Sequence, residues 1–134
     1  MLKMHPTVDQ LWNNMWNEKQ IYLVDKLFSK KFSVYYSGGS VSSHTDFKSL
    51  LSNWFIAFPD LKHTVLDYIE QENRIVTRWS GLGTHEGIFL EIQPTFKKFI
   101  YNGITIFHLS EEGKIHEAWV ANHLTDQLAE LRAK

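Results

Sequence analysis

The chain has 134 residues, of which 43% are hydrophobic and 22% charged, and its formal net charge at pH 7 is -1. This composition excludes a disordered chain and predicts a single globular domain over residues 1–134. The near balance of acidic and basic residues gives no basis for nucleic acid or an anionic membrane surface as a partner. Cysteine is absent, which excludes a disulfide framework and thiolate chemistry.

The sequence contains no segment expected to enter a membrane. No stretch approaches the roughly 20 apolar residues that a spanning helix needs, and the N-terminal residues lack the apolar run of a signal peptide. We therefore expect a cytoplasmic protein. Aromatic residues make up 14% of the chain, and such side chains fill cores or line apolar ligand pockets.

Apolar residues at helical spacing predict three helices and one short strand in the first half of the chain. Thr7 and Thr45 are candidate N-caps of the first and third helices, and Pro59 ends the third. The expected elements are a helix over residues 7–16, a helix over 21–28, a strand over 32–36, a glycine-containing loop over 37–40 and a helix over 45–58.

Four long strands are expected to follow, because Val, Ile, Thr, Tyr and Trp dominate these segments. The resulting order, α-α-β-α-β-β-β-β-α, is typical of an α+β fold with a mostly antiparallel sheet. The expected elements are two strands within residues 58–87 around a turn at 72–74, a connection over 88–95, a strand over 96–110, a turn at 111–113, a strand over 114–122 and a helix over 125–133.

One of these strands is apolar on both faces. Phe99 and Phe107 lie on one face, and Ile100, Ile104 and Ile106 lie on the other. A sheet that is apolar on both faces needs cover on both. The helices can cover one face, so we expect a second copy of the chain on the other, giving a homodimer through the sheet.

Arg78 lies in the interior of the second strand predicted within residues 58–87, between Thr77 and Trp79. Burying it alone would be costly. It therefore either faces a polar cavity, where it could neutralise an enolate or carboxylate of a ligand, or pairs with Asp67 or Glu117.

His85 follows Arg78 at the Gly-rich end of the same strand. Strict alternation puts the two on opposite faces, whereas a bulge at Gly81 or Gly83 would bring them to one face. On the pocket face His85 could act as an acid, a base or a hydrogen-bond donor. The alternative is that it only ties the strand end to the next loop.

Two further histidines have alternative roles. His123 follows the last strand and could serve as a general base, or it could lie at the surface or cap the closing helix. His63 is in phase with Leu61, Val65 and Ile69, so we expect a buried histidine in the core. No tight H-x-H or H-x₃-H spacing occurs, so we expect no metal site.

Short motifs in order along the chain carry a family resemblance. They are Phe58-Pro59-Asp60-Leu61, Arg78-Trp79, Gly83-Thr84-His85-Glu86-Gly87, Pro94-Thr95 and Gly113-Lys114-Ile115-His116-Glu117-Ala118-Trp119. The chain resembles the SnoaL-like polyketide cyclase and ester cyclase family of the nuclear-transport-factor-like superfamily. This resemblance implies a cone-shaped, curved sheet wrapped by N-terminal helices, like a cystatin-like roll. It also implies a dimer and a deep apolar pocket that binds a small, mostly apolar molecule without a cofactor.

The sequence departs from the cyclases where their chemistry resides. The aspartate that serves them as general acid and base falls on Val120, and a second acidic position falls on His123. The polar pair on the preceding strand falls on Thr105 and Phe107. These departures put the family's aldol cyclisation in doubt.

Two functions remain open from the sequence. One is cofactor-free isomerisation, cyclisation or hydration near a carbonyl, with His85 or His123 moving the proton and Arg78 stabilising negative charge. The other is a non-catalytic ligand-binding or dimerisation module. An enzyme should carry an ionisable group with a strongly perturbed pKa in its pocket. The expected ligand-binding residues are Trp16, Tyr36, Trp54, Phe58, His63, Thr105, Phe107 and Val120.

Overall fold

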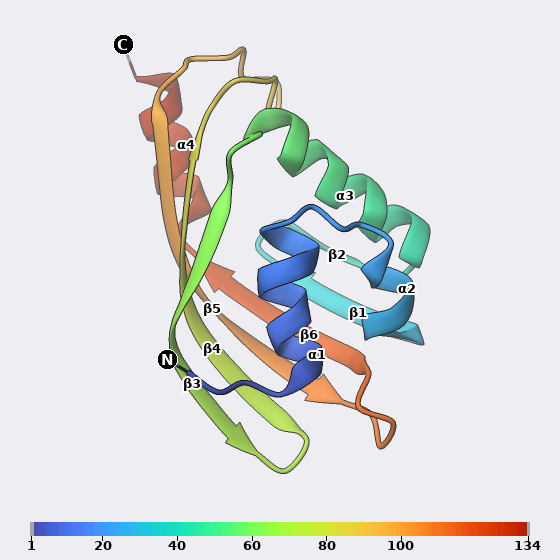
Figure 1. Ribbon diagram of the computed structural model, residues 1–134. Helices are drawn as coiled ribbons and strands as arrows, with labels where there is room; N and C mark the ends of the chain where they lie inside the picture. The colour runs from blue at the N-terminus through green and yellow to red at the C-terminus, as the bar shows by residue number, and fades with distance from the viewer. Residues whose placement is uncertain (1, 134) are drawn as a thin grey trace.

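The computed structural model describes residues 2–133. Figure 1 shows a curved sheet that partly encloses the N-terminal helices and α3 on its concave side. The helices are α1 (Pro6–Gln10), the π-helix η1 (Leu11–Trp16), α2 (Leu23–Leu27), α3 (His44–Ala57) and α4 (Leu124–Arg132). The strands are β1 (Phe28–Tyr36), β2 (Gly39–Val41), β3 (Lys62–Gln71), β4 (Arg74–Thr84), β5 (Lys98–Leu109) and β6 (Ile115–Asn122).

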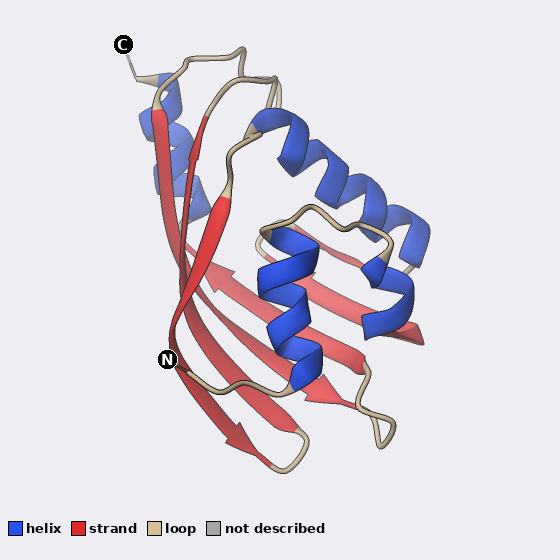
Figure 2. Ribbon diagram, in the orientation of Figure 1, coloured by secondary structure: helices blue, strands red, loops and turns tan. Residues whose placement is uncertain are grey.

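The six strands form one sheet in the order β2-β1-β6-β5-β4-β3. All neighbouring strands are antiparallel except β1 and β6, which are parallel. The sheet is open, with β2 and β3 at its edges, and Figure 2 shows the strands wrapping around the helices. The predicted α+β fold, a curved and mostly antiparallel sheet wrapped by N-terminal helices, is confirmed.

The helix starts differ from those expected from the sequence. His5, rather than Thr7, caps α1, because its Nδ1 accepts a hydrogen bond from the Thr7 backbone N–H at 3.1 Å and Pro6 takes the first helical position. Ser43, rather than Thr45, caps α3 by accepting from the Asp46 N–H at 3.1 Å. In both cases a nearer side chain reaches the free N–H groups of the first turn.

The first strands also differ from expectation. β1 begins at Phe28, which the helical spacing had placed in a helix, and the loop after it contains the short strand β2. β1 and β2 form a hairpin in which Val34 pairs with Val41. Gly38 has φ +99°, a conformation that glycine adopts without steric cost, and this allows the tight reversal.

Of the two arrangements left open for β4, the structure has regular alternation, with no bulge at Gly81 or Gly83. β4 pairs with β5 without interruption, and the register shift lies on β3, between Val65 and Asp67. Leu66 is therefore an additional residue on β3, and the residues after it point to the opposite face from the one that regular alternation predicts. Ile69 is therefore 64% exposed, although the sequence had placed it on the buried face of His63.

The face of the sheet away from the helices is apolar and open in the single chain. Ile100, Ile104, Ile106 and Leu82 are all exposed there, at 38% or more of their surface. Within residues 2–133, no helix is long and apolar enough to cross a bilayer.

Candidate functional site

A cavity of about 780 Å³ lies between the concave face of the sheet and the helices η1 and α3. Its wall is largely aromatic and includes four tryptophans, from η1, α3 and β4. Seven of the residues expected from the sequence line it: Trp16, Tyr36, Trp54, His63, Thr105, Phe107 and Val120. Phe58 lines no part of it, because its side chain is fully buried and stacked on Phe99.

A histidine and a tyrosine meet in this cavity across three strands. Gly81 of β4 pairs with His63 of β3 on one side and with Tyr101 of β5 on the other. A Cβ at Gly81 would lie 2.9 Å from Tyr101 Cδ1, closer still to Cε1, and 3.2 Å from His63. The glycine thus leaves the space in which the two side chains meet, and His63 Nε2 lies 2.5 Å from the Tyr101 hydroxyl.

Trp79, a second aromatic residue of the cavity wall, also lies against a glycine on the neighbouring strand. Trp79 pairs with Gly103 across β4 and β5, and a Cβ at Gly103 would lie 2.8 Å from Trp79 Cη2. The Trp79 indole N–H donates to Thr105 Oγ1 at 2.9 Å, so both of these polar groups already have a partner. Gly81 and Gly103 thus each leave space for an aromatic side chain of the cavity wall, Tyr101 and Trp79 respectively.

Burial fixes the protonation state of the histidine and tyrosine. Loss of solvation lowers the pKa of His63 from 6.5 to about 3 and raises the pKa of Tyr101 well above its usual value. Both side chains are therefore neutral at pH 7. The cavity thus contains the perturbed ionisable group expected of an enzyme, although in its uncharged form.

The hydrogen bond between these side chains also assigns the histidine tautomer. Among the residues described, the buried Tyr101 hydroxyl has only His63 Nε2 as a side-chain partner. If the hydroxyl donates to Nε2, the proton of His63 lies on Nδ1, and only one buried N–H remains without an acceptor. The other tautomer would leave the Tyr101 O–H unpaired as well, which is the costlier arrangement.

Two buried polar nitrogens on the cavity wall have no hydrogen-bond partner within residues 2–133. They are Trp12 Nε1 and His63 Nδ1. Both side chains are only 4% exposed, and their ring centroids lie 5.1 Å apart. With the tautomer assigned above, both nitrogens are buried N–H donors without an acceptor within residues 2–133.

Asn17 connects the helical lid to the strand that carries the histidine. Its side-chain nitrogen donates to the His63 carbonyl at 2.8 Å, and its oxygen accepts from the His63 N–H at 2.7 Å. β3 is an edge strand, so Asn17 satisfies backbone groups that have no neighbouring strand. This pair of bonds fixes the position of His63 relative to η1.

Arg78 lies apart from the cavity. Its Nε donates to Asp67 Oδ2 at 2.5 Å on the outer face, and both side chains are more than half exposed. Of the alternatives that the sequence left open, the geometry matches the cross-strand ion pair with Asp67. The structure does not bring Arg78 together with His85 or His123.

His85 lies in the core at the end of β4. It is fully buried, and its Nδ1 accepts from the Thr95 N–H at 3.2 Å and lies 2.9 Å from Thr95 Oγ1. Burial lowers the pKa of His85. These bonds tie the strand end to the following loop, and His85 lines no part of the cavity.

His123 is also outside the cavity wall. It occupies the N-cap position of α4, and its Nε2 accepts from the Asn102 backbone N–H at 3.0 Å. Val120, three residues earlier on β6, does line the wall. Asp46, on the exposed first turn of α3, is the one carboxylate among the lining residues.

Sequence reasoning missed the roles of Trp12 and Tyr101. Nothing in the helical spacing around Trp12 shows that its N–H lacks an acceptor. Tyr101 meets His63 only through the register of three strands, which the sequence does not display. Gly81 was the available signal, because a glycine inside a strand often marks a close approach by neighbouring groups.

The comparisons with known proteins agree with this architecture. The model of the SnoaL-like polyketide cyclase family matches residues 6–133. The chain belongs to this family. No curated protein matches the chain at a significant level.

Solved structures with the same fold are numerous, and three serve as examples. A protein from Jannaschia sp. CCS1, assigned to the SnoaL-like polyketide cyclases, has a TM-score of 0.87 at 18% identity and covers 100% of this chain and 99% of its own. AclR from Streptomyces galilaeus, described as a candidate hydroxylase, has a TM-score of 0.77 at 27% identity and covers 87% of this chain and 73% of its own. An NTF2-like protein from Exiguobacterium sp. 255-15 has a TM-score of 0.72 at 21% identity and covers 87% and 98%.

Proposed function

We propose that this SnoaL-like protein binds a small, mostly apolar carbonyl compound in its cavity and moves a proton at the carbon next to that carbonyl without a cofactor. The observation that carries this proposal is the pair of buried, unpartnered nitrogens on Trp12 and His63. Buried donors without acceptors are costly. A ligand oxygen between them removes that cost and explains why an aromatic cavity keeps two polar groups.

The neutral state of His63 suits this role. A neutral imidazole N–H can polarise a carbonyl and stabilise the enolate that forms when a neighbouring carbon loses its proton. Tyr101 holds the tautomer that places the proton on Nδ1. The Trp12 N–H supplies a second donor to the same developing negative charge.

The proton acceptor that we propose is Asp46. It is the one carboxylate among the lining residues, and its side chain is exposed. A carboxylate can act as the general base that accepts the proton. The cavity residues named here replace Arg78, His85 and His123 as the candidates for chemistry.

Matched probes test the binding step. 2-Acetylnaphthalene and 2-ethylnaphthalene have similar shapes, but only the first carries a carbonyl oxygen. We expect the ketone to bind at least tenfold more tightly in a tryptophan fluorescence titration, because four tryptophans line the cavity. Trp12→Phe should remove most of that preference, whereas Trp16→Phe, which changes the same wall without removing an unpartnered buried N–H, should keep it.

Hydrogen exchange tests the proton-transfer step. In D₂O, the protein should accelerate exchange of the acetyl protons of 2-acetylnaphthalene above the buffer rate, as followed by proton NMR. Asp46→Asn should abolish the acceleration while leaving ketone binding intact, and Trp12→Phe should weaken both. Ketone-selective binding without accelerated exchange in the wild-type protein would contradict catalysis and leave a binding function.

The second candidate is therefore a non-catalytic binding module. Val120 favours it, because valine at this position of the cavity wall cannot transfer a proton where the resemblance to cyclases places an aspartate. The binding and exchange measurements separate the two functions, since a binding module satisfies the first and not the second.

We further propose that the chain forms a homodimer through the outer face of the sheet. Leu82 of β4 and the isoleucines of β5 at positions 100, 104 and 106 are exposed there. Large exposed apolar patches on a small domain mark interaction sites. Analytical ultracentrifugation should show a dimer for the wild type and a monomer for Ile104→Lys; a wild-type monomer at all concentrations would overturn this proposal.

A further inference from the structure

We infer that His108, His116 and Glu117 form a binding site for Zn²⁺ or a similar borderline divalent metal at one end of the β5–β6 hairpin. One nitrogen of each histidine and one oxygen of the glutamate lie within 4.8 Å of one another. Two imidazoles and a carboxylate are a common ligand set for Zn²⁺, with a fourth position open to water. This site is separate from the cavity.

A register shift creates the cluster. Glu117 pairs with His108 and Ile115 pairs with Leu109, so His116 is an additional residue on β6 at this point. A bulge redirects a side chain that regular alternation would place on the other face. Here it allows two consecutive residues of β6 to approach the same histidine of β5.

The distances match a metal site better than a hydrogen bond. His108 Nδ1 lies 3.6 Å from Glu117 Oε1, which is too long for a hydrogen bond. Two ligands about 2.1 Å from a tetrahedral metal lie about 3.4 Å apart. Metal binding requires the three ligand atoms, which lie within 4.8 Å of one another, to close to about that separation.

None of the three ligand groups is committed elsewhere in the described part of the chain. His108 Nε2 is buried without a partner, and neither His116 nor Glu117 makes a side-chain hydrogen bond there that would have to be broken. Trp119 packs edge-on against the His108 ring, with centroids 5.1 Å apart, and shields one side of it. The imidazole is thus held in place but free to act as a ligand.

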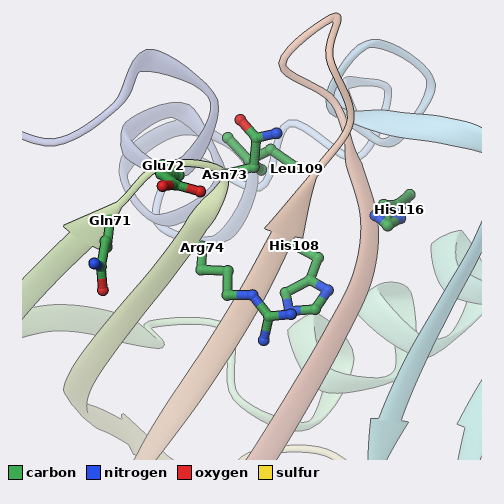
Figure 3. A pocket seen from close by; sticks show the side chains of 7 residues that line it. All are labelled: Gln71, Glu72, Asn73, Arg74, His108, Leu109 and His116. Atoms are coloured by element: carbon green, nitrogen blue, oxygen red, sulfur yellow. The ribbon is translucent and has the colours of Figure 1, made fainter.

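A groove of about 440 Å³ is lined by the two histidines of the cluster and not by Glu117, and Figure 3 shows its wall. Gln71, Asn73 and Arg74 contribute to it from the β3–β4 end, and His108 and His116 from the β5–β6 end. Arg74 pairs directly with His108 in the strand register. Its positive charge opposes a bound cation, so Arg74 should limit the affinity of the site.

This cluster could not be predicted from the sequence. The two histidines lie eight positions apart, on different strands, and the spacing matches no metal motif. They meet only because the hairpin register and the bulge bring them together.

Isothermal titration of the tag-free, metal-stripped protein with ZnCl₂ tests the inference. We expect one Zn²⁺ per chain and no binding of Mg²⁺, which prefers oxygen ligands. His108→Asn, His116→Asn and Glu117→Gln should each weaken Zn²⁺ binding at least about tenfold. His123→Asn, which removes a histidine outside the cluster, should leave it unchanged, and Arg74→Gln should tighten it.

Cobalt supplies an independent readout. Co²⁺ bound by these three ligands and water should give the intense visible absorption of a four- or five-coordinate ion, and each ligand variant should lose it. No Zn²⁺ binding, equal weakening by His123→Asn, or one ion per two chains would overturn the inference. Circular dichroism of each variant establishes that it is folded, and the partial exposure of all three residues favours that.

Discussion

The two faces of strands β3, β4 and β5 carry polar side chains in opposite physical states. On the concave face, His63 and Tyr101 are buried, joined by a hydrogen bond and neutral. On the outer face of the same sheet, Arg78 and Asp67 are exposed and charged, and they neutralise each other. Polar groups without a partner therefore remain on the buried face, whereas the charged groups on the exposed face satisfy each other.

The largest effect that we expect follows from protonation of His63. Its pKa is about 3 in the folded protein, against 6.5 for an unperturbed histidine. Between these values the unfolded chain binds a proton that the native chain does not. Stability is therefore complete above pH 6.5 and is lost as the pH falls, by about 1.4 kcal/mol per pH unit, reaching a loss on the order of 4 kcal/mol near pH 3.

Urea unfolding of the wild type and His63→Gln from pH 7.5 to pH 4 measures this contribution. Glutamine cannot titrate, so the wild type should lose stability more steeply with falling pH than the variant. Because burial also lowers the pKa of His85, His85→Gln gives the size of the other histidine's contribution. Parallel profiles for the wild type and His63→Gln would show that folding does not lower the pKa of His63.

Gly81→Ala should disrupt the contact between His63 and Tyr101 on the concave face. The added methyl group would overlap the Tyr101 ring and crowd His63, so the ring must move and the hydrogen bond between the two side chains must lengthen. We expect a loss of about 1–3 kcal/mol in the free energy of unfolding, measured by urea denaturation. Ser80→Ala, on the neighbouring position of β4, should change stability little; equal losses would mean that Tyr101 can relax freely.

Val120→Asp should sharpen the contrast by placing a carboxylate on the concave face. Desolvation will destabilise the protein by about 1–3 kcal/mol and raise the pKa of the new carboxyl group. If Val120 marks the position of the family's proton-transfer residue, exchange of the acetyl protons of 2-acetylnaphthalene should accelerate as the pH rises through that pKa. Val120→Asn is the matched control without a base, and equal exchange rates for the two variants would contradict this placement.

The comparison of the faces also shows which features the sequence could reveal. Alternation along β5 correctly separated Phe99 and Phe107 from Ile100 and Ile104, because burial repeats every two residues. Alternation also predicted a buried His63. It failed at Ile69, since the bulge between Val65 and Asp67 on the same strand changes the phase, and nothing about Leu66 in the sequence signals it.

The candidate site was less accessible to sequence reasoning than the fold. The contact between His63 and Tyr101 depends on three strands in exact register with a glycine between them, and such a contact has no local pattern. Arg78 illustrates the opposite error. A charged residue in a strand looked functional, but its partner Asp67 lies directly opposite on β3, and the sequence alone could not choose between these alternatives.

The smallest effect should come from this outer ion pair. Arg78→Gln should lower the free energy of unfolding by no more than about 1 kcal/mol, because exposed pairs gain little Coulomb energy in water and are screened by salt. A double-mutant cycle with Asp67→Asn, measured at low and high salt, should give a coupling energy that falls as salt rises. Arg78→Gln should also bind 2-acetylnaphthalene and exchange its protons like the wild type. A lost exchange rate with unchanged stability would place Arg78 in the chemistry after all, and the two faces could then no longer be treated as independent.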